Sequence, residues 1–321
     1  MNCNSEEQFD VYSHFSSQLK RAQIVSRTED VFCRFCELTF PRLEQLSLTS
    51  QFYWYEYDPE IAVGFIQRHS TLRSLCIDIV SKPKALVNVI TNHILQLTAL
   101  SIALNPYCRM NWEKGSFESL AKLTKLKHLK CRGDIGTNIF YKCKAITSLK
   151  SVYVKLLCTH DQLDLLRDVH KVAPQLKSLG IGGTETNESA VKFICKHFSN
   201  LSCLKIRWSK VETGEGLARI ANLPRLRELG LWTYDECRDY RHIPRNHVRF
   251  LTLCCNWKDS DGDLLQLPKI FPGLEKLDLY PLVTVRSSTV ERIHKMIPEC
   301  RINVHRGSAC LQPFNDAINV E

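Results

Sequence analysis

The chain has 321 residues, of which 44% are hydrophobic and 24% are charged, and its formal net charge at pH 7 is +9. No apolar run approaches the roughly 18 residues of a membrane-spanning helix. Residues 1–8 lack the basic start and the apolar stretch of a secretory signal. The sequence therefore predicts neither a membrane protein nor a secreted one.

The first segment, residues 1–18, is expected to be an N-terminal helix or partial cap. Phe9, Tyr12, Phe15 and Leu19 are spaced as on one face of a helix. Such a helix would belong to a repeat whose strand lies upstream of Met1, or it would cover one end of the fold.

From Leu19 onward, one apolar block recurs along the chain. Its clearest copy is residues 274–279, LEKLDL, with the pattern L-x-x-L-x-L. The copies begin at Leu19, Leu43, Leu72, Leu97, Leu126, Leu149, Leu176, Leu201, Leu226, Val248, Leu274 and Ile297. Steps of about 25 residues lie within the period of leucine-rich repeats.

The block pattern predicts a strand in each repeat. Side chains alternate along a strand, so the second and third apolar positions of the block point inward together. One repeat cannot bury its own apolar row, so neighbouring repeats must stack. We predict an α/β leucine-rich repeat solenoid over residues 19–304, an open horseshoe with parallel strands on the concave face and helices on the convex face. Residues 305–321 would form a C-terminal tail.

Segments between the blocks predict the helices. Pro83 suits the first position of a helix, and Thr186-Asn187 precedes another apolar run at helical spacing. Ser288-x-x-Glu291 reads as a capping box. Residues 233–247 show no helical period and are expected to form a charged loop.

The number and spacing of the cysteines indicate the cellular compartment and limit the kinds of site that the chain could form. The fifteen cysteines are scattered and odd in number, which favours reduced thiols in a cytoplasmic or nuclear protein. Cys33-x-x-Cys36 has no second pair at zinc-site spacing. We predict no catalytic site, no metal site and no cofactor.

The predicted concave face supplies the candidate contact residues. The third and fifth positions of each block, and the residue after it, point away from the core. The partner-binding candidates are His128, Lys130, Arg132, Tyr153, Lys155, Lys205, Arg207, Trp232 and Tyr280. Lys155 and Arg207 would lie about 10 Å apart. Gly180 and Gly182 between them would leave a notch for a partner side chain or an anionic group.

Positive charge is concentrated in one window. Residues 121–155 contain nine Lys or Arg and one Asp, whereas the rest of the chain is nearly neutral. This window would engage an acidic or phosphorylated segment of a protein substrate. The alternative is a solvated lysine-rich surface that keeps the solenoid soluble.

An aromatic run follows the first clear block. Phe52, Tyr53, Trp54, Tyr55 and Tyr57 are more aromatic side chains than one inward face can hide. They would form an exposed recognition loop, because aromatic residues are enriched at interfaces. Alternatively, they cover the start of the solenoid.

The irregular steps of about 25 residues, one helix per repeat and scattered cysteines resemble the leucine-rich repeat region of F-box proteins over residues 19–304. In that family an F-box docks on the Skp adaptor of a cullin ubiquitin ligase, and the repeats hold the substrate. No F-box is visible before Leu43, so contact with the Skp adaptor and cullin requires one upstream.

Three functions follow from these features. The first is substrate recognition within an SCF-type ubiquitin ligase, and the second is an intracellular scaffold or regulatory binder with no link to a ligase. The third is a binder of nucleic acid or inositol phosphate through the basic window, which we disfavour. We expect no enzyme activity and no membrane partner.

Overall fold

The computed structural model describes residues 2–3, 13–26, 29–50, 59–79, 83–104, 112, 114–133, 139–156, 162–208, 215–236, 239–256, 261–281 and 285–305. The chain divides into two compact units. The first comprises residues 1–160 and 171–174, and the second comprises residues 161–170 and 175–321.

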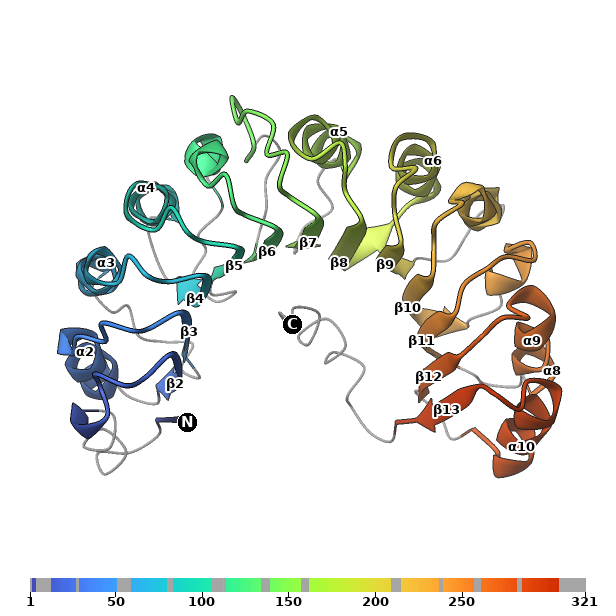
Figure 1. The fold of residues 1–321 in the computed structure, drawn as a ribbon. Coiled ribbons are helices and arrows are strands. Elements are labelled where there is room, and N and C mark those ends of the chain that lie inside the picture. Colours follow the sequence, from blue (N-terminus) through green and yellow to red (C-terminus); the bar gives the residue numbers. More distant parts are fainter. Residues whose placement is uncertain are drawn as a thin grey trace. The chain divides into compact units, whose positions relative to one another are not determined.

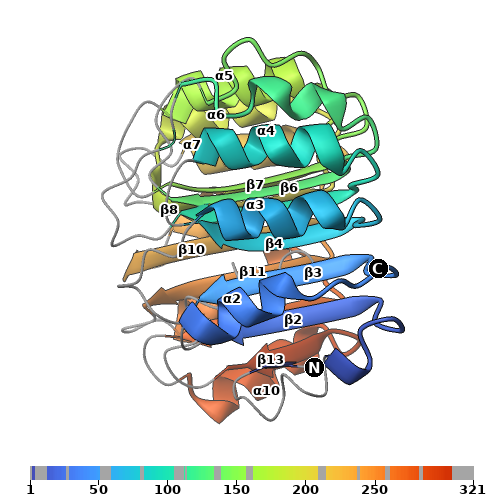
Figure 2. The same ribbon diagram turned by 90° about the vertical axis from the view of Figure 1, so that its left-hand side faces the viewer.

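The first unit is a stack of parallel strands, each hydrogen-bonded to the next one in chain order (Figure 1). Its strands are β1 (Asn2–Cys3), β2 (Arg21–Ser26), β3 (Gln45–Ser50), β4 (Ser74–Ile79), β5 (Ala99–Leu104), β6 (His128–Gly133) and β7 (Ser151–Leu156). Its helices are α2 (Glu29–Glu37), α3 (Pro59–Arg68), α4 (Pro83–His93) and the 3-10 helix η1 (Glu118–Lys122). Figure 2 shows α2, α3 and α4 in parallel rows over one side of these strands.

The second unit repeats this arrangement with shorter helices. Its strands are β8 (Ser178–Thr186), β9 (Cys203–Trp208), β10 (Glu228–Glu236), β11 (Phe250–Asn256), β12 (Lys276–Pro281) and β13 (Arg301–Val304), paired in parallel in this order. Its helices are α6 (Glu188–His197), α7 (Glu215–Ala218), η2 (Arg219–Asn222), η3 (Asp239–His242), α8 (Asp261–Leu264), α9 (Leu267–Ile270) and α10 (Ser287–Met296). Helix α5 (Gln162–Val172) begins in the second unit and ends in the first.

The predicted block pattern is confirmed by burial. Leu129 and Cys131 of β6, and Leu277 and Leu279 of β12, are completely buried. The first leucine of the block is buried as well, as at Leu43. In each unit the strands therefore bury one face against the helices and leave the other without a helical layer (Figure 1). This is an α/β fold built from stacked strand and helix repeats.

Side-chain hydroxyls tie consecutive repeats together just before several of the strands. The Thr71 hydroxyl donates to the Leu43 carbonyl, and the Thr98 hydroxyl donates to the Arg73 carbonyl. In the second unit the Ser202 hydroxyl donates to the Lys177 carbonyl. Every one of these bonds runs from a repeat to the repeat before it.

The predicted helix starts are correct in two of three cases. Helix α4 begins at Pro83, and the Asn187 side chain caps α6 by accepting a hydrogen bond from the Ala190 N–H. The predicted capping box at Ser288 is wrong, because α10 already begins at Ser287. There the backbone carbonyl of Arg286 accepts the Thr289 N–H, and no side chain caps the helix.

Two other expectations change. The segment 233–247 is not entirely loop, since β10 extends to Glu236 and η3 follows it. At the other end of the chain, β1 pairs in parallel with β2. A strand therefore precedes the segment around Phe15 within the chain itself.

A buried histidine joins two repeats of the first unit. His69 Nε2 accepts the Phe40 N–H at 2.9 Å, and His69 Nδ1 lies 2.7 Å from the Phe65 carbonyl oxygen. The imidazole also stacks on the Phe65 ring, with centroids 4.0 Å apart. Burial lowers the pKa of His69 below 6.5, although the bond to Phe65 opposes the shift. His69 is therefore neutral, with its proton on Nδ1.

We predict that the stability of the first unit falls as the pH drops below 6.5. The pKa of His69 is lowered in the folded state, so the unfolded chain binds a proton first. Protonation would also place a hydrogen on Nε2, which could no longer accept the Phe40 N–H. The free energy of unfolding should decline by up to about 1.4 kcal/mol per pH unit, measured by urea denaturation between pH 7.5 and 5.

The variant His69→Gln should flatten this decline, and His93→Gln, which alters an exposed histidine at the end of α4, is the matched control. An equal pH slope in the parent chain and in His69→Gln would contradict the assignment.

Candidate partner-binding surface

In the first unit a row of side chains crosses four strands on the face opposite the helices. The register aligns Asp78 of β4 with Ala103 of β5, Arg132 of β6 and Lys155 of β7. Arg132 Nη2 lies 3.1 Å from Asp78 Oδ1. The pair spans β5 because the methyl side chain of Ala103 does not obstruct it. Asp78 therefore offsets a charge that the sequence predicted for a partner.

Two predicted contact residues lie on this face but are buried by their neighbours. Lys130 is 5% exposed and Tyr153 is 4% exposed. They are register partners, and Lys130 Nζ lies 5.4 Å from the Tyr153 ring centroid, within range of a cation–π contact. A lysine can bury its methylene stem along an apolar surface in this way. The partner-binding role of both residues stays a prediction.

The phenol of Tyr153 is held in its neutral form. Burial raises its pKa well above the usual value, although the charge of Arg132 acts in the opposite direction. Tyr153 can therefore donate a hydrogen bond throughout the physiological pH range.

The start of β6 lies in a positive electrostatic environment. His128, the first residue of the strand, is partly exposed. Burial lowers its pKa, and the positive charges of Lys127 and Lys150 lower it further. Lys155, at the other end of the neighbouring strand β7, is also partly exposed. Both ends of these strands thus present basic side chains.

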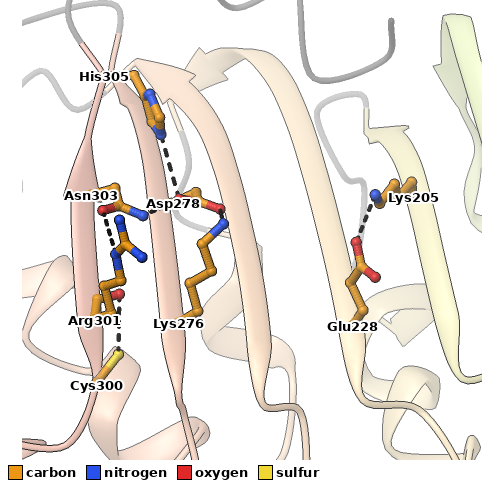
Figure 3. A network of polar contacts seen from close by, with 8 residues as sticks. All are labelled: Lys205, Glu228, Lys276, Asp278, Cys300, Arg301, Asn303 and His305. Atoms are coloured by element: carbon orange, nitrogen blue, oxygen red, sulfur yellow. Dashed lines mark hydrogen bonds and ion pairs between the residues drawn. The ribbon is translucent and has the colours of Figure 1, made fainter. Parts of the chain in front are cut away.

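In the second unit, Lys205 is held by an acidic neighbour. Lys205 Nζ lies 2.6 Å from Glu228 Oε1 on the next strand (Figure 3). Burial alone would lower the pKa of Lys205, but Cys203 and Glu228 outweigh it, so the pKa is raised. The lysine therefore remains charged. Arg207, the register partner of Trp232, is partly exposed.

An aromatic row continues from Trp232 to the end of the second unit. The register aligns Trp232 of β10 with Cys254 of β11 and Tyr280 of β12, and these three side chains pack together. The Tyr280 ring then stacks on His305, with centroids 4.1 Å apart and planes 3° from parallel. Tyr280 and His305 remain partly exposed, so this end of the row is accessible.

Trp232 lies against the backbone of Gly230. A Cβ placed on Gly230 would be 2.2 Å from Trp232 Cη2 and 2.4 Å from Cζ3. The absence of a side chain at Gly230 therefore creates the surface on which the indole rests. This explains why Trp232, predicted to contact a partner, is only 4% exposed.

Asp278 organises a polar network that sequence analysis missed (Figure 3). Its carboxylate accepts from Lys276 Nζ at 2.6 Å and from Asn303 Nδ2 at 2.7 Å, and His305 Nε2 lies at 3.4 Å. Burial would raise the pKa of Asp278, but the bonds from Lys276 and Asn303 outweigh it and hold the pKa below 3.8.

The signal for this network was present in the repeat pattern. Asp278 is the fifth residue of its block, the position that Lys205 occupies in its own block. Extending that column from Gly230 through Thr252 to Asp278 would have found it.

Two predicted features stay predictions. The aromatic run Phe52–Tyr57 lies outside the described residues. Lys155 belongs to the first unit, whereas Gly180, Gly182 and Arg207 belong to the second. The notch expected between these residues would involve both units, and it stays a prediction.

The described side chains form no group of three or more His, Cys, Asp or Glu residues that could hold a metal ion. Nine cysteines, Cys36 among them, are free thiols. Burial is the main cause that raises the pKa of Cys36 to about 12, and the neighbouring Cys33 adds to the shift. This thiol is therefore protonated at physiological pH. Among the helices in these ranges, none combines the length and the apolar character needed to cross a membrane.

The repeat geometry decides the class of fold. Parallel strands at intervals of one repeat, most of them followed by a helix on the same side, are the arrangement that the leucine blocks require. The chain therefore has a leucine-rich repeat fold.

The chain matches no family model and no curated protein. Among solved structures, it is similar to the leucine-rich repeat-containing protein LegL7 from Legionella pneumophila, with 16% identity, a TM-score of 0.46 and coverage of 83% of this chain and 92% of that one.

Two further structures are similar. An internalin (inlF) from Listeria monocytogenes has 14% identity and a TM-score of 0.37, with coverage of 92% of this chain and 89% of that one. TLR13, solved as a TLR13–ssRNA13 complex, has 15% identity and a TM-score of 0.45, with coverage of 88% of this chain and 41% of that one.

We predict that Asp278→Asn destabilises the second unit by about 1–3 kcal/mol. The amide would turn a donor toward Lys276 Nζ or Asn303 Nδ2, both of which are donors themselves. The contribution of Asp278 is present above pH 3.8 and is lost as the pH falls through its lowered folded-state pKa. Urea denaturation at pH 7 measures the effect.

Asp164→Asn is the control, because Asp164 pairs with Arg167 on the exposed side of α5. Such exposed pairs contribute about 0.5 kcal/mol or less. Equal losses in the two variants would show that the Asp278 network adds nothing beyond an ordinary surface pair.

We also predict that Gly230→Ala displaces the Trp232 indole. The new methyl group would overlap the ring, so the side chain must move toward solvent, at a cost of roughly 1–3 kcal/mol. The tryptophan emission of Gly230→Ala should therefore shift to the red. Because the chain contains other tryptophans, the change is assigned to Trp232 by making Gly230→Ala in a Trp232→Phe background, where the shift should disappear.

Gly262→Ala serves as the control, since a Cβ there meets no atom within 4 Å. Unchanged emission in Gly230→Ala would contradict the packing of Trp232 against Gly230.

Proposed function

We propose that the chain is a recognition module that holds a segment of a protein partner against its strand faces. The main support for this proposal is the alignment of charged and aromatic side chains on the face of each unit that has no helical layer. In the first unit the row contains Arg132 and Lys155, and in the second it contains Arg207 and Tyr280. All four side chains are partly exposed.

The ion pairs on these faces support recognition. Arg132 with Asp78, Lys205 with Glu228 and Lys276 with Asp278 hold charged groups at fixed positions on the strands. Side chains fixed before binding lose less conformational entropy when a partner arrives. A segment lying across the strands would meet a new strand about every 4.8 Å.

We further propose that the module selects substrates for an SCF-type ubiquitin ligase in the cytoplasm or nucleus. Support comes from the resemblance of the repeats to those of F-box proteins and from the scattered cysteines. The Skp adaptor would bind an F-box in the complete gene product. A module that captures a partner but does not retain the Skp adaptor would instead be a scaffold or regulatory binder.

The strand-face assignment is tested by photo-crosslinking in cells. A photoreactive amino acid at Tyr280 or at Lys155 should capture a partner protein. The same group at Lys196, exposed near the end of α6, should not. Capture from Lys196 but from neither strand-face position would contradict the proposal.

The ligase assignment needs a separate measurement. The complete gene product, purified from cells, should retain the Skp adaptor and cullin in stoichiometric amounts. Absence of the adaptor, together with crosslinking from Tyr280, would leave a binding module with no link to a ligase.

A further inference from the structure

Sequence analysis placed the anion-binding charges of the first unit along its strands, but several of those charges are committed elsewhere. Lys130 is buried beside Tyr153, and Arg132 is paired with Asp78. The exposed lysines lie instead at the edge where the strands begin. Lys127 immediately precedes β6, with Lys125 two residues before it, and Lys150 immediately precedes β7.

Backbone hydrogen bonds fix the relative positions of Lys127 and Lys150. The Lys127 carbonyl accepts the N–H groups of both Lys150 and Ser151, at 2.8 and 2.9 Å. The Thr98 carbonyl accepts those of Lys127 and His128 in the same way. The side chains of the two lysines therefore extend from the starts of neighbouring strands, which are about 4.8 Å apart.

Arg73 extends this arrangement toward the start of the unit. It immediately precedes β4, and its carbonyl accepts the N–H groups of Thr98 and Ala99. Arg73, Lys127 and Lys150 thus occupy the same position in three repeats, with Thr98 in the repeat between. We refer to Arg73, Lys125, Lys127 and Lys150 as the strand-start row.

Some basic side chains elsewhere in the chain are paired with carboxylates. At the same strand-start position in the second unit, Arg249 Nη1 lies 2.9 Å from Glu275 Oε1. In the strand-start row, by contrast, Lys125 donates to the amide oxygen of Gln96, a neutral group. Within the described ranges, no carboxylate pairs with Lys127 or Lys150.

The segments that contain Lys127 and Lys150 carry an excess of positive charge. The described residues 114–133 and 139–156 contain ten Lys or Arg and one acidic residue, Glu118. The positive field reaches the start of β6, where Lys127 and Lys150 help to lower the pKa of His128. Like charges at adjacent strand positions repel each other, so an anion bound between them would relieve a repulsion already present in the fold.

We propose that the strand-start row binds an acidic or phosphorylated segment of the protein partner, lying in an extended conformation across the beginnings of β4 to β7. This deepens the proposed function and rests on it. Alternate residues of an extended chain are about 6.6 Å apart, so successive anionic side chains can approach successive basic positions. Lysine and arginine donate charge-assisted hydrogen bonds to carboxylate and phosphate oxygens.

A nucleic acid is less well suited to this surface. In single-stranded nucleic-acid sites, aromatic side chains usually interleave with the basic ones to stack the bases. The two tyrosines nearest in sequence already lie near cations. Lys130 Nζ is 5.4 Å from the Tyr153 ring centroid, and Lys114 Nζ is 4.1 Å from the Tyr141 ring centroid. The observations therefore favour a polypeptide, and RNA is a competing outcome of the test.

The test uses the full chain and fluorescent probes at low and physiological salt. The probes are an eight-residue glutamate-rich peptide, the same peptide with two phosphoserines, and an eight-nucleotide RNA. The variant Lys127→Gln/Lys150→Gln removes the central charges of the row. The control Lys142→Gln/Lys144→Gln removes the same net charge beside Cys143, which packs near Glu118 and Ala121 of η1.

We expect both peptides to bind the parent chain, with the phosphorylated one binding more tightly. The strand-start variant should weaken binding roughly tenfold, and the control variant less than twofold. Three outcomes would overturn the proposal: no peptide binding at low salt, equal weakening by both variants, or tighter binding of RNA than of either peptide.

The same variants carrying the photoreactive group at Tyr280 separate this inference from the proposed function. Crosslinking at Tyr280 together with unchanged peptide affinity in Lys127→Gln/Lys150→Gln would overturn the role of the row alone. Loss of crosslinking in the parent chain would count against the proposed function itself.

Discussion

The structure depends on one constraint, which is that a single repeat cannot bury its own leucine row. Residues such as Leu129 and Leu277 leave water only when the neighbouring strands lie alongside in register. The same register places the intervening side chains in rows on the opposite face. The hydrophobic contacts of one face thereby determine the geometry of recognition on the other, although the two faces share no side chain.

Those rows are largely neutralised within the protein. Asp78 offsets Arg132, Glu228 offsets Lys205 and Asp278 offsets Lys276. A face made in this way presents polar groups at fixed positions without a large net charge. The strand-start row differs because its lysines face amides or solvent. Among the described residues, positive charge without a paired carboxylate therefore lies at the edge of the first unit where its strands begin.

Much of the fold could be predicted from the sequence, because the apolar spacing sets both the strand positions and their order. Pro83 and Asn187 marked helix starts correctly because each acts through local backbone chemistry. The Ser288 capping box failed because the carbonyl of Arg286 took that role, and a side-chain pattern cannot indicate such a backbone choice.

The candidate site was less predictable. Position in the block correctly placed Lys130, Tyr153 and Trp232 away from the leucine core, but it did not reveal that their neighbours bury them. Burial on this face depends on contacts between adjacent repeats, such as Lys130 beside Tyr153, and within one strand, such as Trp232 over Gly230. A residue without a side chain gives little warning of what rests on it.

The hydroxyl bonds between repeats give each stack a polarity. Thr71, Thr98 and Ser202 all donate toward the preceding repeat, as do the backbone amides beside them. Trimming a unit from its last strand would uncover carbonyl acceptors, which water solvates readily. Trimming from its first strand would instead strip partners from several donors at once. The two ends of a stack are therefore unequal as sites for truncation, fusion or the addition of designed repeats.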